Sequence, residues 1–292
     1  MSNTVFFGTP EFAVFVLEEL HDAGITPDII VNAPDKLAGR GLVLKAPPVK
    51  EWAEEHDIPV LQPETLKQPS VQPPEVAQNA ETEKAMDILL NSEWDVFLVA
   101  AYGKILPKNI IDAPARGVLN VHPSLLPRFR GASPIESQIL GDEKTVGVSI
   151  MQIDEEMDHG PIVAQATVTP EEWPLKASLL EELLAREGGR LLAEVLPLWL
   201  KNEIEAVEQV HDQATFTKKI SKTDGEIDLA DDAYQNYLKY LAYDVWPGTF
   251  FFDRNGKRIK IINAEYKNDT FTPLTVIPEG KKEIPYDDFL RH

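Results

Sequence analysis

The sequence predicts an α/β protein, in which a parallel sheet with covering helices precedes a small, mostly β domain. In the first part of the chain, strand-like apolar runs alternate with helical patterns, as they do in βαβ units. Residues 94–103 form an apolar run that closes in a turn, which is typical of a strand covered on both faces. Near the C-terminus, residues 246–252 and 258–266 are strand-like and flank a hairpin turn at 253–257.

The opening strand, at residues 5–8, leads directly into a helix. We expect Thr9 to cap this helix, with Pro10 at its first position and Glu11 in its first turn. The positive end of the helix dipole then already has a carboxylate beside it, and no GxGxxG motif follows. The sequence therefore predicts a Rossmann-like sheet that does not bind a dinucleotide at this turn.

Two polar side chains lie at the end of a strand predicted at residues 117–122. Asn120 and His122 occupy alternate positions, so both should project from one face at the carboxyl end of the strand, where open α/β sheets bind ligands. An Asn amide can donate to a developing oxyanion, and a His can move a proton or stabilise charge. Asp158, within residues 157–160, can orient the His or accept a proton from an amine. Together they suit acyl transfer to nitrogen, whereas each one alone could simply satisfy backbone groups.

The remaining segments set the domain organisation. Residues 67–80 contain several prolines and are expected to form an exposed loop. Residues 177–200 form a long amphipathic helix whose leucines belong in the core, where it can close the first domain against the sheet. Residues 201–213 are polar and acidic and are predicted to be a linker. We therefore assign a catalytic domain to residues 1–206 and a small β-rich domain to residues 207–292.

The composition is compatible with an intracellular enzyme. At 292 residues, the chain can bury a sizeable core in one large or two ordinary domains. It has no cysteine, which excludes disulfides and thiolate chemistry. No apolar stretch is long enough to span a membrane, and the N-terminus enters a strand rather than a signal peptide, so we expect a cytoplasmic location.

The charge is strongly negative but unevenly distributed. The chain carries 28 Lys and Arg against 48 Asp and Glu, and this net charge of −20 opposes non-specific attraction to a polyanion. Acidic residues dominate the stretch 51–95, whereas basic residues gather around Asn120, in later segments and in an early loop that contains Lys36, Arg40, Lys45 and Lys50. A basic track on an acidic body is compatible with a nucleic-acid partner, and the alternative is an ordinary solvated surface.

Taken together, these motifs resemble the folate-dependent formyltransferase family, and within it the branch that formylates methionyl initiator tRNA. The resemblance covers nearly the whole chain. The segments that carry it are residues 5–12, 33–41, 47–50, 101–103, 120–127, 131–135, 157–160 and 245–248.

The resemblance implies 10-formyltetrahydrofolate as formyl donor, with its pterin ring against the loops at 101–103 and 154–158. The prolines at 123 and 127 would make the segment 124–127 a stiff wall of this pocket. The donor-binding residues implied are Ala101, Tyr102, Gly103, Ser124, Leu125, Leu126, Pro127 and Asp154.

The resemblance also implies how the acceptor, an aminoacylated initiator tRNA, would react. Its free amine attacks the formyl carbon, Asn120 donates to the oxyanion, and His122 stabilises or protonates the tetrahedral intermediate. Asp158 takes the amine proton or holds the His. The residues implied to bind tRNA are Lys36, Arg40 and Lys45, and Arg40 is the candidate for a bidentate phosphate contact.

The end of the chain departs from the family pattern. The tRNA branch carries a small barrel here, but few further strands fit after residue 266. Residues 276–282 and 286–290 resemble the closing segment of the family, arriving early. The sequence therefore predicts an abbreviated, OB-like domain, and we expect a monomer.

Three other functions share parts of this pattern. A sugar-nucleotide N-formyltransferase would use the same Asn, His and Asp with another acceptor, and a formyltetrahydrofolate hydrolase would transfer the formyl group to water. A non-catalytic folate-binding module is the third, against which the intact Asn120, His122 and Asp158 argue. Residues 154–159 form the one cluster with metal-ligand chemistry, and the formyltransferase resemblance explains them without a metal.

Overall fold

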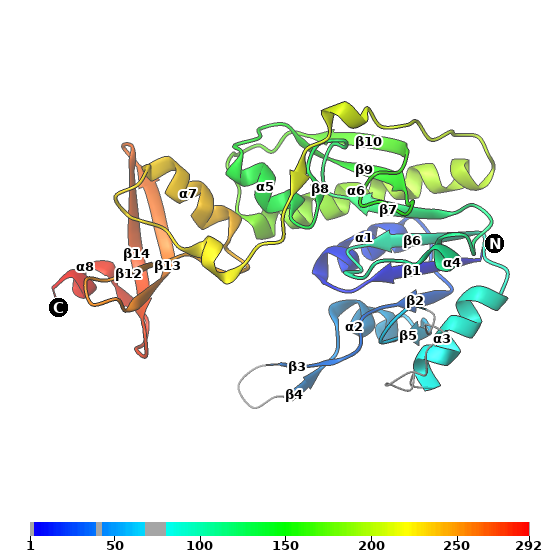
Figure 1. The fold of residues 1–292 in the computed structure, drawn as a ribbon, viewed down its shortest axis with the longest axis horizontal. Helices are drawn as coiled ribbons and strands as arrows, with labels where there is room; N and C mark the ends of the chain where they lie inside the picture. The colour runs from blue at the N-terminus through cyan, green and yellow to red at the C-terminus, as the bar shows by residue number, and fades with distance from the viewer. Residues whose placement is uncertain (1–2, 39–42, 68–79, 292) are drawn as a thin grey trace. The chain divides into compact units, whose positions relative to one another are not determined.

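The computed structural model describes residues 3–38, 43–67 and 80–291, which form two compact units (Figure 1). The first, here called the sheet unit, comprises residues 1–128, 147–167 and 182–214. The second, the C-terminal unit, comprises residues 129–146, 168–181 and 215–292. Arg40 and all but the ends of the loop predicted at 67–80 lie outside the described residues.

In the described residues, seven strands form the main sheet in the order β10-β9-β7-β6-β1-β2-β5. Their bounds are β1 (Thr4–Gly8), β2 (Ile29–Val31), β5 (Val60–Leu61), β6 (Val96–Ala100), β7 (Val118–His122), β9 (Val146–Gln152) and β10 (Ile162–Val168). The pairs from β5 to β7 are parallel, whereas β7 and β9 are antiparallel. The predicted strand within residues 94–103 is confirmed as β6, and every residue of β6 is buried. The fold class predicted from the sequence is confirmed.

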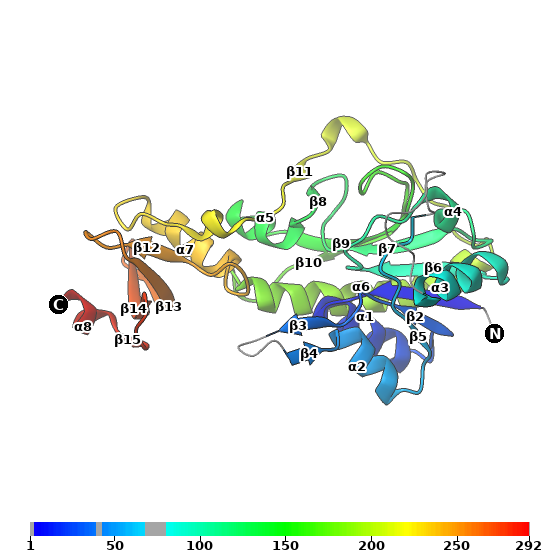
Figure 2. The same cartoon turned by 60° about the horizontal axis from the view of Figure 1, so that its bottom comes forward.

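Helices cover both faces of this sheet. They are α1 (Glu11–Asp22), α2 (Pro48–Glu55), α3 (Ala80–Asn91), α4 (Lys108–Ile111) and α6 (Ala177–Leu200). Figure 2 shows α1 and α6 on one side of the sheet and α4 on the other. A buried cluster joins Val5 and Val118 of the sheet to Leu89 of α3 and Ile110 of α4. No helix in the described part of the chain combines the length and apolarity needed to cross a membrane.

The predicted helix at 177–200 is confirmed as α6, and two consecutive glycines let it approach its neighbours closely. A Cβ at Gly188 would lie 2.4 Å from Cγ1 of Val121 on β7, and one at Gly189 would lie 2.7 Å from Cβ of Glu19 on α1. Side chains at these positions would therefore push the helix away from the sheet and from α1. Because Val121 faces α6, the alternate residues Asn120 and His122 face the opposite side.

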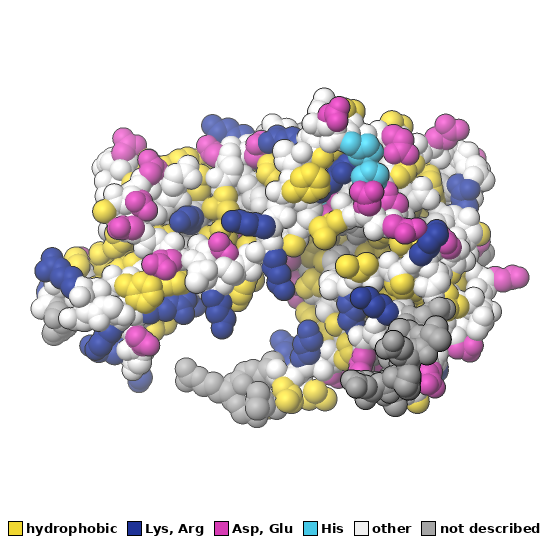
Figure 3. Space-filling model, in the orientation of Figure 1, with side chains coloured by type: hydrophobic (Ala, Val, Ile, Leu, Met, Phe, Trp, Pro, Cys, Tyr) yellow, Lys and Arg dark blue, Asp and Glu magenta, His cyan; other side chains and the backbone are white. Residues whose placement is uncertain are grey.

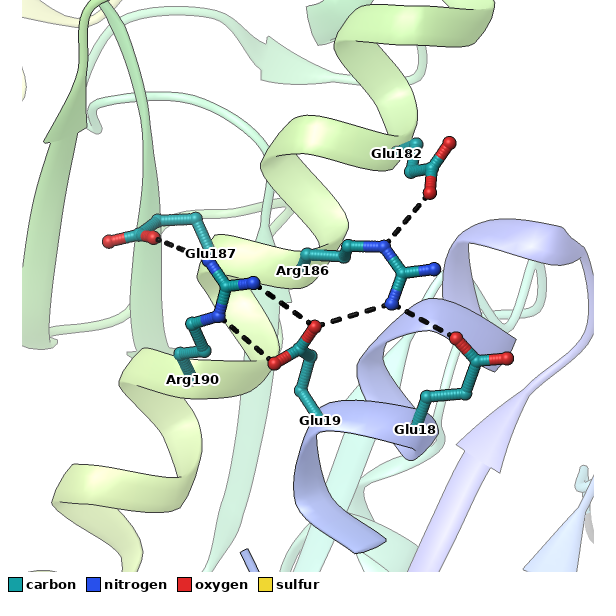
Figure 4. A network of polar contacts seen from close by, with 6 residues as sticks. All are labelled: Glu18, Glu19, Glu182, Arg186, Glu187 and Arg190. Carbon is teal, nitrogen blue, oxygen red and sulfur yellow. Dashed lines mark hydrogen bonds and ion pairs between the residues drawn. The ribbon is translucent and has the colours of Figure 1, made fainter. Parts of the chain in front are cut away.

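An ionic network fastens α6 to α1 (Figure 4). Arg186 lies 3.0 Å from a carboxylate oxygen of Glu18, 3.3 Å from one of Glu19 and 2.9 Å from one of Glu182. Arg190 contacts Glu19 at 3.0 Å. Glu19 is the shared partner of both guanidinium groups, and its side chain is only 14% exposed.

We expect Glu19→Ala to lower the free energy of unfolding by about 1–3 kcal/mol, because it removes the half-buried acceptor that both arginines share. Glu187→Ala is the matched control, since Glu187 makes one longer contact, at 3.7 Å to the exposed Arg190. It should change stability by less than about 0.5 kcal/mol. Urea unfolding of both variants measures the difference, and equal effects would mean that the network does not fasten the two helices.

The expected cap of α1 is wrong. The helix begins at Glu11 with Pro10 as its N-cap residue, and no side chain caps it. The Thr9 hydroxyl instead donates to the Tyr102 carbonyl oxygen and accepts from the Ala33 N–H, each at 3.2 Å. Thr9 thus connects the segments that follow β1, β6 and β2, and these cross-sheet contacts compete with capping.

The C-terminal unit contains an antiparallel sheet in the order β12-β13-β14-β15, formed by β12 (Phe250–Phe252), β13 (Arg258–Lys267), β14 (Thr270–Pro278) and β15 (Ile284–Pro285). Helix α7 (Ala233–Ala242) packs on it through ring contacts such as Tyr240 with Phe271. The unit also contains α5 (Pro134–Leu140), α8 (Tyr286–Leu290) and the paired strands β8 (Arg130–Gly131) and β11 (Phe216–Thr217).

The hairpin predicted at residues 253–257 is confirmed, since the Asp253 N–H donates to the Lys257 carbonyl oxygen at 2.9 Å. Few further strands follow, as expected, namely β14 and the two-residue β15, although the sequence did not identify β14, which pairs with β13 over most of its length. The strand was missed because its sequence contains two prolines, Pro273 and Pro278, which disfavour strands. Pro273 lies opposite Ala264, beside a register shift in β13, where the hydrogen-bond ladder is interrupted and a missing N–H costs little.

Candidate active site

Asn120 and His122 end β7 as predicted and lie on the same face of the sheet. Asn120 is half-buried and pairs in register with Val99 of β6, while His122 is 4% exposed. The His122 Nδ1 lies 3.7 Å from the Asp158 Oδ1, so a protonated His122 can form an ion pair with this carboxylate. The structure therefore brings together His122 and Asp158, which lie on distant segments of the sequence, and Asn120 shares the face of β7 on which His122 lies.

Asp158 lies in a tight loop between β9 and β10. Its φ of 50° is in the left-handed region, which Asp tolerates better than most residues. Gly160 is required nearby, because a Cβ there would lie 2.0 Å from the Gln152 carbonyl oxygen. This close approach explains the glycine of the segment 157–160.

The loop after β6 contributes Ala101, Tyr102 and Gly103. Ala101 and Gly103 have φ angles of 46° and 78°, so the chain turns sharply at the sheet edge. Tyr102 points into the core, where its ring packs edge-on against Phe7, and burial raises the pKa of its hydroxyl. A Cβ at Gly103 would meet nothing within 4 Å, so open space lies in front of this turn.

The loop after β7 is held by hydrogen bonds to residues of β9 and β10. The Ser124 hydroxyl donates to the Arg128 carbonyl oxygen at 2.7 Å. The Ser149 hydroxyl accepts from the Leu126 N–H at 3.1 Å and donates to the Ser124 carbonyl oxygen at 2.6 Å. Gln165 donates to the Leu126 carbonyl oxygen at 2.9 Å. Sequence reasoning missed Ser149 and Gln165, because they are ordinary polar residues within strands.

Two further residues of this loop, Leu125 and Pro127, were predicted to bind the donor. Leu125 lies over Gly147 of β9, where an added Cβ would come within 2.6 Å of a Leu125 methyl carbon. Pro127 follows a cis peptide bond. Both belong to a segment whose backbone is held by hydrogen bonds on each side.

Asp154 organises the loop in which Asp158 lies. One carboxylate oxygen accepts from the Glu156 N–H at 2.9 Å, and the other lies 2.6 Å from His159 Nδ1. His159 stacks on His211, with ring centroids 4.1 Å apart and an interplanar angle of 3°. No group of three or more His, Cys, Asp or Glu in the described residues could hold a metal ion.

Lys36 and Lys45 lie opposite each other on an antiparallel hairpin formed by β3 (Lys36–Ala38) and β4 (Val43–Lys45). Leu37, Val43 and Leu44 are 61–69% exposed, and Figure 3 shows hydrophobic side chains on the surface of this hairpin. Large apolar side chains that are exposed together, beside a pair of lysines, are unusual on a surface that contacts only water.

A polar cluster holds the base of the hairpin. Lys50 Nζ donates to both carboxylate oxygens of Asp35, at 3.0 and 2.9 Å, and to Gln62 at 2.9 Å. The hydrogen bond from Lys50 lowers the pKa of Asp35. Between this base and the turn before α1 is a hollow of about 340 Å³, lined by Thr9, Pro10, Glu11, Ala33, Pro34, Lys36, Lys45, Ala46, Pro47 and Pro48.

The segments that follow β7, β6, β1 and β2 lie at one edge of the sheet, whereas the loop that contains Asp158 leaves β9 beside Leu119, near the amino end of β7. The strand order β7-β6-β1-β2 is parallel throughout, so His122, Ala101, Thr9 and Asn32 follow one another along the carboxyl ends of four adjacent strands. A ligand lying along this edge could therefore reach the Asn120–His122 pair and the hairpin base. The arrangement suits a reaction between two bound molecules.

Residues 2–196 match the family model described as formyl transferase, and residues 219–284 match the one for the formyl transferase C-terminal domain. The methionyl-tRNA formyltransferase of Chloroflexus aggregans is 43% identical over 260 residues, which cover 89% of this chain and 79% of that protein. The corresponding protein of Myxococcus xanthus is 39% identical over 284 residues, or 96% of this chain and 84% of that protein.

Solved structures show the same fold at lower identity. An N-formyltransferase from Helicobacter canadensis, in complex with folinic acid and dTDP-3-aminofucose, superposes with a TM-score of 0.65 at 16% identity, covering 98% of this chain and 99% of that chain. The methionyl-tRNA formyltransferase from Clostridium thermocellum superposes with a TM-score of 0.57 at 15% identity, covering 98% of this chain and 100% of that chain.

Proposed function

The chain belongs to the formyl transferase family, and on that premise we propose that it transfers the formyl group of 10-formyltetrahydrofolate to the free amino group of methionyl initiator tRNA. The observation that carries the proposal is the close approach of His122 and Asp158 beside Asn120, in a chain that is about 40% identical to proteins named methionyl-tRNA formyltransferase. The sugar N-formyltransferases among the similar structures share 16–21% identity, which supports the fold alone.

The proposed reaction assigns one role to each of the three side chains. The acceptor amine attacks the formyl carbon, and negative charge develops on the formyl oxygen, to which the Asn120 amide donates. Asp158 accepts the proton that the attacking nitrogen loses, and His122 donates a proton as the bond from carbon to the folate nitrogen breaks. The 3.7 Å separation of His122 and Asp158 lets the carboxylate also stabilise a protonated imidazole.

The donor pocket is proposed to lie between the turn after β6 and the loop after β9. A pterin ring is flat and carries hydrogen-bond donors and acceptors, so it suits a slot between the turn at 101–103 and the loop at 154–158. Ser124, Leu125, Leu126 and Pro127 form the wall, and their hydrogen bonds to β9 and β10 hold it rigid. We assign Asp154 to shaping this slot, through its bonds to Glu156 and His159.

The β3–β4 hairpin is proposed to contact the acceptor end of the tRNA. Lys36 and Lys45 supply positive charge for phosphates, while Leu37, Val43 and Leu44 supply apolar surface for unpaired bases. Arg40, between the two strands in sequence, is proposed to contact phosphate as well. The hollow at the base of the hairpin then lies where the aminoacyl group would enter.

We expect the double substitution of Lys36 and Lys45 by Ala to weaken tRNA binding at least about 100-fold, because two charge-assisted contacts of about 1.5–3 kcal/mol each are lost. The slope of the logarithm of the tRNA association constant against the logarithm of the salt concentration should become less steep by about 2, which is about 1 for each lost phosphate contact. Donor binding should stay unchanged. Filter binding across a salt series measures the affinity for tRNA, and titration with the folate donor measures donor binding.

The exposed Lys201, at the end of α6, provides the matched control. Lys201→Ala should leave both tRNA affinity and its salt dependence unchanged. An unaltered salt slope in the Lys36 and Lys45 variant, or an equal loss of donor binding, would contradict the assignment of the hairpin to tRNA.

The proposed function itself is tested by formyl transfer from 10-formyltetrahydrofolate to charged initiator tRNA. We expect one formyl group on the methionyl amine for each tetrahydrofolate released. Release of tetrahydrofolate at the same rate without any acceptor would identify a hydrolase instead.

A further inference from the structure

The segment that follows α6 packs against the loop that contains Asp158. We predicted residues 201–213 to be a linker, and this is wrong in part. Val207 and Ile162 exchange both backbone hydrogen bonds, each at 2.8 Å, so the segment pairs antiparallel with the start of β10. In Figure 1, the chain after α6 runs back past β10.

Gln209 contacts the candidate catalytic loop directly. Its side-chain amide donates to the Asp158 carbonyl oxygen at 3.0 Å and to the Gly160 carbonyl oxygen at 2.7 Å. Gln209 is only 5% exposed, so water does not readily replace these hydrogen bonds. The two carbonyl groups flank the left-handed turn at Asp158, a conformation that needs support from its surroundings.

His211 adds a third contact on the same side. It stacks on His159, which in turn lies against Asp154 at the start of the loop. Residues 207, 209 and 211 thus lie along one segment, in which Val207 pairs through its backbone and His211 begins the short 3-10 helix η1 (His211–Gln213). They contact β10, the turn at Asp158 and the neighbouring His159 in order, and Gln209 is the member that bonds to Asp158 itself.

We propose that Gln209 is a positioning residue that holds the Asp158 carboxylate in register with His122. The inference rests on the role proposed above for Asp158. Without the Gln209 amide, the turn could relax and carry the carboxylate away from the 3.7 Å approach to the imidazole. A displacement of about 1 Å of a reacting group can lower a rate about 100-fold.

Gln209→Glu is the sharpest variant, because it keeps the shape and replaces the donating amide with a carboxylate that faces two carbonyl oxygens. We expect kcat for formyl transfer to fall about 10- to 100-fold. Asn236→Asp is the matched control, since the Asn236 amide is also buried and donates to a loop carbonyl oxygen, that of Asp228, at 2.6 Å. It should lower the thermal unfolding temperature and leave kcat within twofold.

A double-mutant cycle separates positioning from general destabilisation. In an Asp158→Asn background, Gln209→Glu should change the residual kcat by less than twofold, because the group that Gln209 positions is already absent. An equal fold-loss in both backgrounds, or no loss in the wild-type background, would overturn the proposal.

A prior assay and a second variant distinguish a failure of the proposal for Gln209 from a failure of the proposed function or of folding. Formyl transfer by the unsubstituted protein is measured first, so that a failure of the proposed function is seen there and not in the variants. If Gln209→Glu does not fold, Gln209→Asn replaces it, because the amide is retained one methylene short of the loop. Its kcat should fall less steeply, and again only when Asp158 is present; a loss independent of Asp158 would overturn the proposal.

Discussion

Asn120→Ala is expected to lower kcat for formyl transfer about 100- to 1,000-fold, the usual cost of removing one oxyanion donor. Asn120 lies at the end of β7, where its position is fixed by pairing with β6 and β9. In the proposed mechanism, its amide interacts with the substrate most strongly once charge has developed on the formyl oxygen. The loss should therefore appear in kcat, while the dissociation constant of the donor stays within a few-fold.

Single-turnover kinetics and equilibrium binding of the donor measure these two quantities. Asn91→Ala at the end of α3 is the control, since the Asn91 amide contacts only the exposed side chain of Asp87 in the described residues. It should leave both quantities within twofold. Turnover of Asn120→Ala within a few-fold of the wild type would refute the role of Asn120.

The second large effect is expected for Asp158→Asn, which should lower kcat about 100- to 10,000-fold. The substitution keeps the size of the side chain and the tolerance for a left-handed turn. It removes the proposed proton acceptor and the carboxylate whose oxygen lies 3.7 Å from the His122 imidazole. Rates are measured at saturating donor and acceptor and at several pH values. The loss should appear at every pH at which the wild type is active.

Asp269→Asn controls for the substitution itself, because Asp269 also has a left-handed φ, of 55°, and lies in the turn between β13 and β14. It should be as active as the wild type. If Asp158→Asn keeps more than a tenth of the wild-type kcat, neither proton transfer nor charge stabilisation can be the task of Asp158.

The parts of the fold predicted correctly are those in which local pattern and burial agree. The strand at 94–103 is apolar throughout because both faces are covered, and the helix at 177–200 has a continuous apolar stripe. The alternation of Asn120 and His122 follows from strand geometry alone. Their positions at the sheet edge could therefore be derived without a structure.

The failures come from contacts between distant segments. The Thr9 side chain could cap a helix, but its hydroxyl instead forms hydrogen bonds with the Tyr102 carbonyl oxygen and the Ala33 N–H. Strand β14 contains prolines that only a neighbouring irregularity in β13 makes tolerable. Gln209 lies in a polar stretch with no motif, and only the folded chain shows that its amide reaches Asp158. No spacing rule in a single sequence encodes such contacts.

The central claim is that Asn120, His122 and Asp158 transfer a formyl group to the amine of methionyl initiator tRNA. One assay tests it most directly. The protein and 10-formyltetrahydrofolate are incubated with charged initiator tRNA, uncharged tRNA, an amino-sugar nucleotide or no acceptor, and formylated product is quantified. We predict product with charged tRNA only, despite the net charge of −20. Product with the amino sugar and none with charged tRNA would contradict the claim.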